Sequence, residues 1–134
     1  MMIENGLMSK ALSIQQNAAE VGFDWDSAEP ILDKLAEEIE ELKEWLPKRF
    51  DSSENQELVH GEMEKELGDC FFVLINLARK LGVNPESALL STIHKFEKRF
   101  SFMESELQKL GKTMKESSLE ERGRFWEQAK QLEK

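Results

Sequence analysis

Two groups of acidic residues in this chain have the spacing of a metal-binding site. Glu37, Glu38 and Glu41 form the first group, and Glu66 and Asp69 form the second. Residues three or four positions apart lie on one face of a helix, with their Cβ atoms about 5–6 Å apart. If the two groups lie on facing helices, their carboxylates surround one small volume and repel one another unless a cation lies among them. Oxygen ligands of this kind suit Mg²⁺, Mn²⁺ or Ca²⁺ better than zinc or copper.

The hydrophobic pattern of the segment 54–81 supports a functional role for these acids. At about 100° per residue, Glu66 falls in the middle of the apolar stripe of this predicted helix, and Asp69 and Asn76 lie along its edge. Glu38 lies at the margin of the stripe of the preceding predicted helix. A carboxylate that faces a core is costly unless it is paired or metal-bound, so we interpret these acids as metal ligands. The alternative is a solvated or salt-bridged face, because Glu is common here and forms helices well.

Composition limits the class of protein. The chain has 134 residues, which predicts one domain over 1–134, and its formal net charge of −9 argues against non-specific nucleic-acid binding. It has no apolar run of about 18 residues, so no membrane span is expected. The single cysteine, Cys70, lies on an apolar face and is interpreted as a small buried residue. Without a signal-peptide pattern, a reducing, cytoplasmic setting is expected.

The surrounding pattern predicts an all-α fold. Short loops join five amphipathic helices, which are expected to pack as an antiparallel helical bundle. Gly22, Gly82 and Gly111 are expected to end helices, and Pro47 is expected to end the second helix. The expected helices are 6–21, 28–46, 54–81, 85–110 and 118–132, and the expected N-terminal caps are Ser27, Ser53 with Gln56, Asn84, and Ser118 with Glu121.

The ordered set of motifs resembles the MazG family of nucleoside triphosphate pyrophosphohydrolases. The pattern E-E-x-x-E at 37–41 is followed, after 24 residues, by E-x-x-D at 66–69. The segment 21–25 precedes the first motif, as in the catalytic domain of the bacterial enzymes. The resemblance covers nearly the whole chain, and this chain has room for one such domain where the well-studied bacterial relatives have two in tandem. Further similar segments are 67–79, 95–100 and 125–130.

The resemblance implies an all-α, homodimeric, Mg²⁺-dependent enzyme, with Mn²⁺ able to substitute. Such an enzyme hydrolyses a nucleoside triphosphate between its α and β phosphates and releases a monophosphate and pyrophosphate. The implied metal ligands are Glu38, Glu41, Glu66 and Asp69. The positions that match nucleotide-binding residues are Lys34, Lys95, Arg99 and Trp126. The candidates to accept a proton from the attacking water are Glu37, Glu38 and Glu41.

Each candidate substrate-binding residue also has a purely structural interpretation. Lys95 and Arg99 lie one turn apart and either hold the departing pyrophosphate or pair with neighbouring acids on the surface. Trp126 either stacks on a base or anchors the last helix, and Trp25 either lines a pocket or fills the core. Asn76 either hydrogen-bonds a ligand or an acidic residue, or is satisfied at a helix contact.

Two other functions remain open from the sequence. A relative selective for one triphosphate, such as dUTP or a modified dNTP, would carry the same metal-binding pattern. A non-catalytic helical interaction module would use its apolar stripes for dimerisation and its acids for solubility. Phe71, Phe72 and Ile75 make the third predicted helix apolar on the face away from Glu66. A helix that is apolar nearly all round needs burial on several sides, so we expect a homodimer.

Overall fold

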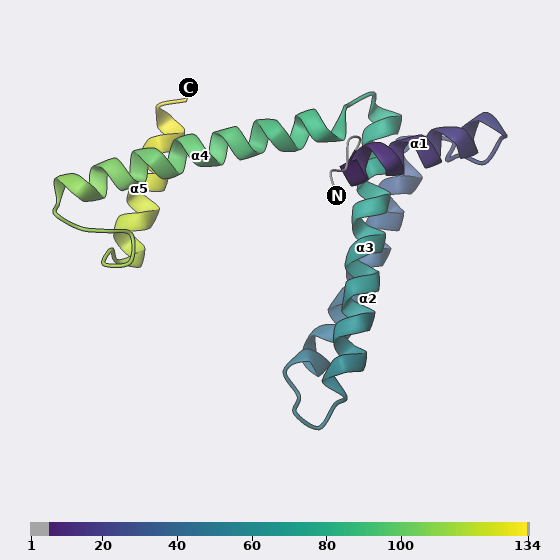
Figure 1. The fold of residues 1–134 in the computed structure, drawn as a ribbon, viewed down its shortest axis with the longest axis horizontal. Helices are drawn as coiled ribbons and strands as arrows, with labels where there is room; N and C mark the ends of the chain where they lie inside the picture. Colours follow the sequence, from purple (N-terminus) through teal and green to yellow (C-terminus); the bar gives the residue numbers. More distant parts are fainter. Residues whose placement is uncertain (1–5, 134) are drawn as a thin grey trace. The chain divides into compact units, whose positions relative to one another are not determined.

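Five α-helices and no strands make up residues 6–133, the part of the chain that the structure, a computed structural model, describes (Figure 1). The prediction of an all-α fold is therefore confirmed. Within these residues, no helix combines the length and the apolar character that crossing a bilayer requires. The helices are α1 (Gly6–Glu20), α2 (Ala28–Arg49), α3 (Gln56–Leu81), α4 (Pro85–Lys109) and α5 (Leu119–Gln131).

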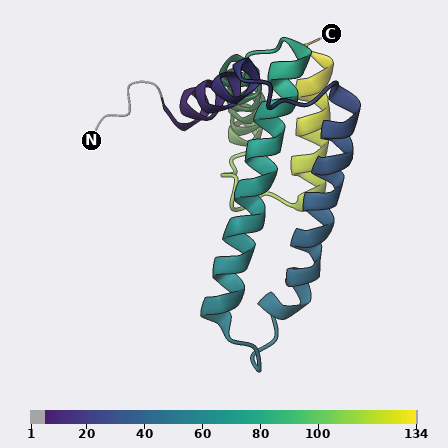
Figure 2. The same cartoon turned by 90° about the vertical axis from the view of Figure 1, so that its right-hand side faces the viewer.

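The first of two compact units, Met1–Glu86, contains the helices that carry both acidic groups. In this unit α2 and α3 run antiparallel, side by side, and α1 packs against α3 (Figure 2). Ile31 of α2 and Val59 of α3 are fully buried, and Cys70 and Val73 extend the buried face of α3. Because the predicted apolar stripes meet in this pair, the acids within and beside the stripes are brought close to the interior.

The second unit, Ser87–Lys134, contains most of α4 and all of α5. Met103 and Leu107 of α4 pack against Phe125 of α5, and Met114 and Trp126 cover this small core. The apolar residues of α4 that take part are four positions apart, so they lie on one face of the helix. That face holds α5 and, with it, the predicted site residue Trp126.

One expectation about the ends of α2 was wrong, and the other was confirmed for the position of the cap but not for its hydrogen bond. Pro47 does not end the helix, which continues to Arg49. Proline has a helical φ and removes one backbone hydrogen bond, so near the end of a helix it weakens the last turn without preventing it. Ser27 precedes the helix in an extended conformation, but its side chain makes no capping hydrogen bond. Glu29 in the first turn instead places a negative charge at the positive end of the helix dipole.

The predicted cap of α3 was also wrong, because Asn55 and not Ser53 caps this helix. The Oδ1 atom of Asn55 accepts hydrogen bonds of 3.1 and 3.2 Å from two backbone N–H groups of the first turn. Ser53 instead donates its hydroxyl to Asp51 at 2.7 Å. Gln56 donates to the carbonyl of Lys48 at 2.9 Å, which closes the loop between α2 and α3. With Asn55 as its cap, the helix starts at Gln56.

Other local signals predicted the helix ends correctly. Ser118 and Glu121 form the expected capping box at the start of α5, with hydrogen bonds of 2.9 and 3.0 Å between side chains and backbone. Gly82 ends α3 with φ 70°, a left-handed conformation that favours glycine. The fourth helix begins at Pro85 as expected.

Candidate metal centre and adjoining cavity

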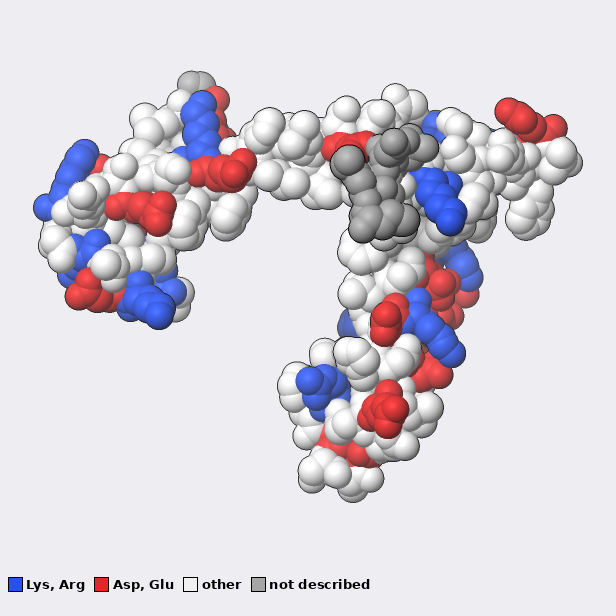
Figure 3. Space-filling view, viewed as in Figure 1, with Lys and Arg blue, Asp and Glu red and all other residues white. Residues whose placement is uncertain are grey.

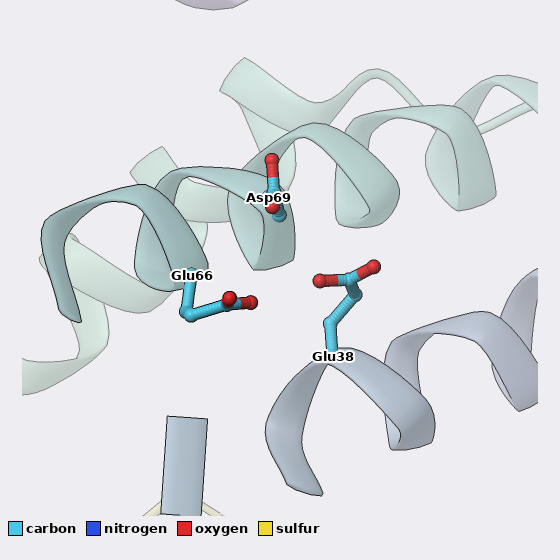
Figure 4. Close-up of side chains that lie close together, drawn as sticks. All are labelled: Glu38, Glu66 and Asp69. Carbon is cyan, nitrogen blue, oxygen red and sulfur yellow. The ribbon is translucent and has the colours of Figure 1, made fainter. Parts of the chain in front are cut away.

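Three carboxylates converge between α2 and α3. Glu38 of α2 faces Glu66 and Asp69 of α3 (Figure 4), and one ligand oxygen of each lies within 4.8 Å of the others. Glu38 is buried, Glu66 is half-buried and Asp69 is exposed, so the group extends from the interior of the helix pair to its surface. The structure therefore brings together three of the four predicted metal ligands, and we call these three residues the acidic cluster.

The acidic cluster has carboxylate oxygens without a hydrogen-bond partner in the part of the chain that the structure describes. Oε2 of Glu38 and Oε2 of Glu66 are buried and have no hydrogen-bond partner among residues 6–133. A buried carboxylate oxygen without a donor is unfavourable, whereas Mg²⁺ and Mn²⁺ prefer oxygen ligands. The donor set therefore fits a hard divalent cation.

Glu41, the fourth predicted ligand, lies beside Glu66 rather than within the group of three. Burial raises the pKa of Glu66, and a hydrogen bond with Glu41 raises it further. The negative charges of Glu41, Glu38 and Asp69 act on this pKa in the same direction. A raised pKa is expected for a partly buried carboxyl group that lies among three other acids.

Lys34 is a basic side chain that pairs with a member of the acidic cluster. Its Nζ lies 3.1 Å from Oε1 of Glu38 and 3.4 Å from Oε1 of Glu37, and these two acids raise the pKa of Lys34. Glu37 is exposed and points toward Lys34. Figure 3 shows Lys and Arg side chains interspersed with Asp and Glu on the visible face of the α2–α3 pair. Lys34 thus partly neutralises Glu38 through Oε1 and leaves Oε2 without a partner.

Cys70 lies close to the acidic cluster on α3. Burial raises the pKa of its thiol, and the charges of Glu38, Asp69, Glu66 and Glu41 raise it further. A thiol with a raised pKa is a poor nucleophile at neutral pH. This agrees with the interpretation of Cys70 as a small buried residue.

A cavity of about 530 Å³ adjoins the acidic cluster within the first unit. Trp25, Lys34 and Asn76, all predicted to bind substrate, line this cavity together. Lys34 connects the two features, since it lines the cavity and pairs with Glu38. The volume lies within the usual range for small-molecule sites, about 300–1,000 Å³. The remaining lining residues are Ile14, Gln15, Ala18, Phe23, Asp24, Phe72, Val73 and Arg79.

An ion-pair network holds the loop that carries Trp25 against α3. The Arg79 guanidinium pairs with Asp24, and Lys80 Nζ lies 2.9 Å from the same carboxylate. Hydrogen bonds from Arg79 and Lys80 hold the pKa of Asp24 well below its usual range. Arg79 also donates to Oδ1 of Asn76 at 3.0 Å. The network therefore fixes two walls of the cavity, the loop with Trp25 and the amide of Asn76.

The other predicted substrate-binding residues lie in the second unit. Arg99 makes hydrogen bonds of 2.9 and 2.7 Å to Glu133, and its guanidinium lies 5.0 Å from the ring centroid of Trp126. The charge of Lys95 contributes to lowering the pKa of Glu133, after the larger effect of Arg99. Trp126 also packs against the core around Leu107. The three predicted residues thus form one local group, in which Arg99 is paired with an acid and Trp126 anchors α5.

Sequence reasoning missed Asp24, Arg79 and Gln15 of the cavity wall. It also missed Glu133, the partner of Arg99. Asp24 and Arg79 are 55 positions apart, and Arg99 and Glu133 are 34 positions apart, so no local spacing indicates either pair. Gln15 did leave a signal. It is a polar residue between Leu12 and Ala18, on the inward face of α1, where an apolar residue is expected.

Comparison with known proteins gives a family match. A family model described as the MazG nucleotide pyrophosphohydrolase domain matches residues 26–101, which include every member of the acidic cluster. A Thermotoga maritima protein named "Nucleoside triphosphate pyrophosphohydrolase/pyrophosphatase MazG" is 41% identical over 123 residues, 92% of this chain and 44% of that protein.

Two more relatives have a lower identity to this chain than the Thermotoga maritima protein has. The Escherichia coli protein named "Nucleoside triphosphate pyrophosphohydrolase" is 35% identical over 126 residues, 94% of this chain and 45% of its own length. The Bacillus subtilis protein named "Uncharacterized protein YabN" is 38% identical over 72 residues, 54% of this chain and 15% of its own length. The chain thus spans a little under half the length of the first two curated relatives.

Proposed function

The chain belongs to the MazG nucleotide pyrophosphohydrolase domain family, and from this premise we propose that it hydrolyses nucleoside triphosphates between the α and β phosphates. The products are a nucleoside monophosphate and pyrophosphate. Two relatives with 35–41% identity carry names that state a nucleoside triphosphate pyrophosphohydrolase. The observation that carries the proposal is the acidic cluster of Glu38, Glu66 and Asp69 with its unpartnered buried oxygens.

The proposed cofactor is Mg²⁺, with Mn²⁺ as a substitute, held by the acidic cluster with Glu41 beside it. When bound, the cation supplies neutralisation of the polyphosphate charge and a water of lowered pKa. This matters because a triphosphate is strongly anionic and the chain itself has a formal net charge of −9. Glu41 is proposed to accept the proton of the attacking water, since Glu38 is a proposed ligand and Glu37 is exposed and paired with Lys34.

Cationic side chains are proposed to bind the phosphates. Lys34 lies between the acidic cluster and the cavity, so its ammonium group can contact a phosphate oxygen once a metal ion compensates Glu38. For Lys95, Arg99 and Trp126, the role in nucleotide binding rests on the family resemblance. An incoming pyrophosphate group would have to compete with Glu133 for Arg99.

A homodimer is proposed on the basis of apolar surface. Phe71 and Phe72 of α3 remain 59% and 43% exposed in the single chain. A second hollow of about 540 Å³ lies along α2 and α3, where Ile39, Leu46 and Leu67 are among its lining residues. Apolar surface of this extent favours burial against another subunit. Sedimentation at micromolar concentration tests this, and a monomer would contradict it.

The experiment that tests the activity is a panel of ribo- and deoxyribonucleoside triphosphates incubated with Mg²⁺. We expect monophosphate and pyrophosphate as products, and release of orthophosphate would contradict the proposed bond cleavage. Glu38→Gln should abolish turnover. Glu40→Gln makes the same chemical change two residues away, on an exposed side chain that pairs with Lys43, and should leave turnover unchanged. Equal activity of both variants would favour a role without catalysis.

A further inference from the structure

Gln15 has a buried amide whose orientation is fixed by its partner. The side chain is 5% exposed, and its Nε2 donates to the backbone carbonyl of Phe72 at 3.0 Å. A carbonyl oxygen can only accept a hydrogen bond, so the NH₂ group of the amide must face Phe72. The Oε1 atom of Gln15 therefore points the other way, and it is buried without a hydrogen-bond partner among residues 6–133.

The unpartnered oxygen belongs to a side chain of the cavity wall. Gln15 lines the cavity of about 530 Å³ together with the aromatic residues Phe23, Trp25 and Phe72. Leaving a buried acceptor unsatisfied is unfavourable, so each such group requires an explanation. A ligand with an N–H or O–H group inside the cavity would satisfy Oε1.

Asn76 offers the complementary group on the same cavity wall. Its Oδ1 accepts from Arg79, and a guanidinium group can only donate, so this oxygen must face Arg79. The Nδ2 hydrogens are then what Asn76 can offer to a ligand. Arg79, which also lines the cavity, adds a second donor, because its Nε is buried without a hydrogen-bond partner among residues 6–133. A cavity with aromatic walls, an acceptor and donors is complementary to a planar base, whose edge carries both kinds of group. Ionised phosphate offers acceptors only.

We propose that Gln15 is a specificity-determining residue that reads the nucleobase, with Oε1 accepting a hydrogen bond from a ring or amino N–H of the base. The base occupies the cavity and the phosphates extend past Lys34 to the acidic cluster. This inference rests on the proposed function, since it assumes that the ligand is a nucleotide. It adds a recognition residue on α1, outside the residues 26–101 that match the family model.

The test is a thermodynamic cycle between residue 15 and the base N–H. Gln15→Met keeps the length of the side chain and removes the acceptor, and Gln16→Met makes the same change on the exposed neighbour as a control. Each protein is assayed for kcat/KM with four natural triphosphates and with analogues that lack the N–H. These analogues are purine riboside and 2-pyrimidinone riboside triphosphates for adenine and cytosine, ring N-methylated triphosphates for guanine and uracil, and inosine triphosphate for the amino group of guanine.

For the preferred base, loss of the N–H should lower kcat/KM of the unsubstituted protein and of Gln16→Met by roughly 10- to 100-fold. In Gln15→Met the same loss should change kcat/KM less than about threefold, because the acceptor is already absent. An effect of added methyl bulk that does not involve residue 15 cancels in this ratio of ratios. The ratio to compare is kcat/KM with the natural triphosphate over kcat/KM with the analogue that lacks the N–H. If this ratio is the same in all three proteins for all four bases, the proposal is overturned and the hydrolase activity still stands.

Calorimetric binding of the α,β-methylene analogues repeats the cycle without catalysis. If the protein binds these analogues but hydrolyses no triphosphate, the proposed function fails and the cycle in Kd still decides the role of Gln15. Coupling of residue 15 to a ribose hydroxyl, seen as a ratio that changes between ribo- and deoxyribonucleotides, would overturn base reading. If Gln15→Met does not fold, the unsubstituted protein alone still tests the proposal. A decrease in kcat/KM of less than threefold for every analogue would overturn it.

Discussion

Asp69→Asn is expected to stabilise the metal-free protein and to abolish its response to Mg²⁺. In the acidic cluster, ligand oxygens of Asp69 and Glu38 lie within 4.8 Å of each other. Two unit charges at 4.8 Å repel by about 3.5 kcal/mol at an effective dielectric constant of 20, and by about 0.9 kcal/mol in bulk water. Asp69 is exposed and Glu38 is buried, so the repulsion between them lies between these limits. Asparagine keeps the shape of the side chain and removes the charge.

The expected change in melting temperature follows from the size of the chain. At about 2.1 cal/mol/K of unfolding entropy per residue, 134 residues correspond to a shift of roughly 3.6 °C for each kcal/mol. Asp69→Asn should therefore raise the melting temperature in EDTA by roughly 3–12 °C. In the unsubstituted protein, Mg²⁺ at about 100 times Kd contributes about 2.7 kcal/mol, or roughly 10 °C. The variant loses a proposed ligand and should show little of this shift.

Thermal unfolding followed by circular dichroism, in EDTA and in excess Mg²⁺, measures both effects. Glu64→Gln is the matched control, because it removes one negative charge from an α3 side chain that is 78% exposed. This control should respond to Mg²⁺ as the unsubstituted protein does. The reasoning fails if Asp69→Asn lowers the melting temperature in EDTA, or if Mg²⁺ stabilises this variant as much as the control.

Three further predictions concern titration, capping and packing. The pKa of Glu66 is raised in the folded protein, so the folded state binds this proton more tightly than the unfolded state does. The stabilisation that results is fully present below about pH 4.5 and is lost as the pH rises. In EDTA, the melting temperature of Glu66→Gln relative to the unsubstituted protein should therefore rise with pH. A difference in melting temperature that stays constant with pH would refute this. Ser118→Ala removes the N-cap of α5 and should lower the free energy of unfolding by about 1 kcal/mol in urea titrations, whereas no change would show that Glu121 caps alone. Leu107→Ala, at a fully buried site, should lower the free energy of unfolding by about 2–5 kcal/mol. Leu110→Ala, at a site 52% exposed, should lower it by less than about 0.5 kcal/mol. Similar decreases for both variants would contradict the assignment of the core.

Sequence periodicity predicted the helices well because helix formation and capping are local. Apolar residues recurring with a period of about 3.6 predicted five helices, and residues 6–133 contain five. The capping box at Ser118 and the left-handed Gly82 needed only neighbours within four residues. The errors arose where two local options competed. Asn55 displaced Ser53 as the cap of α3, and α2 tolerated Pro47 in its last turn.

The acidic cluster was predictable in part because Glu66 lies within an apolar stripe and Glu38 and Asp69 lie at stripe margins. The 3.6-residue period places Glu38 on one face of α2, and Glu66 and Asp69 on one face of α3. Which turn of α2 faces which turn of α3 depends on the loop length and on packing. That register brought Glu38 into the group of three and left Glu41 beside Glu66.

The residue types and their spacing alone determined the helices, the pair of acidic motifs and the resemblance to a family, because each depends on residues close in sequence. Tertiary structure alone decided the cavity and its polar groups. Asp24 meets Arg79 across 55 positions, and Gln15 meets the backbone of Phe72 across 57. Such contacts depend on how α1 and its following loop pack on α3, and no periodicity within one helix contains that information.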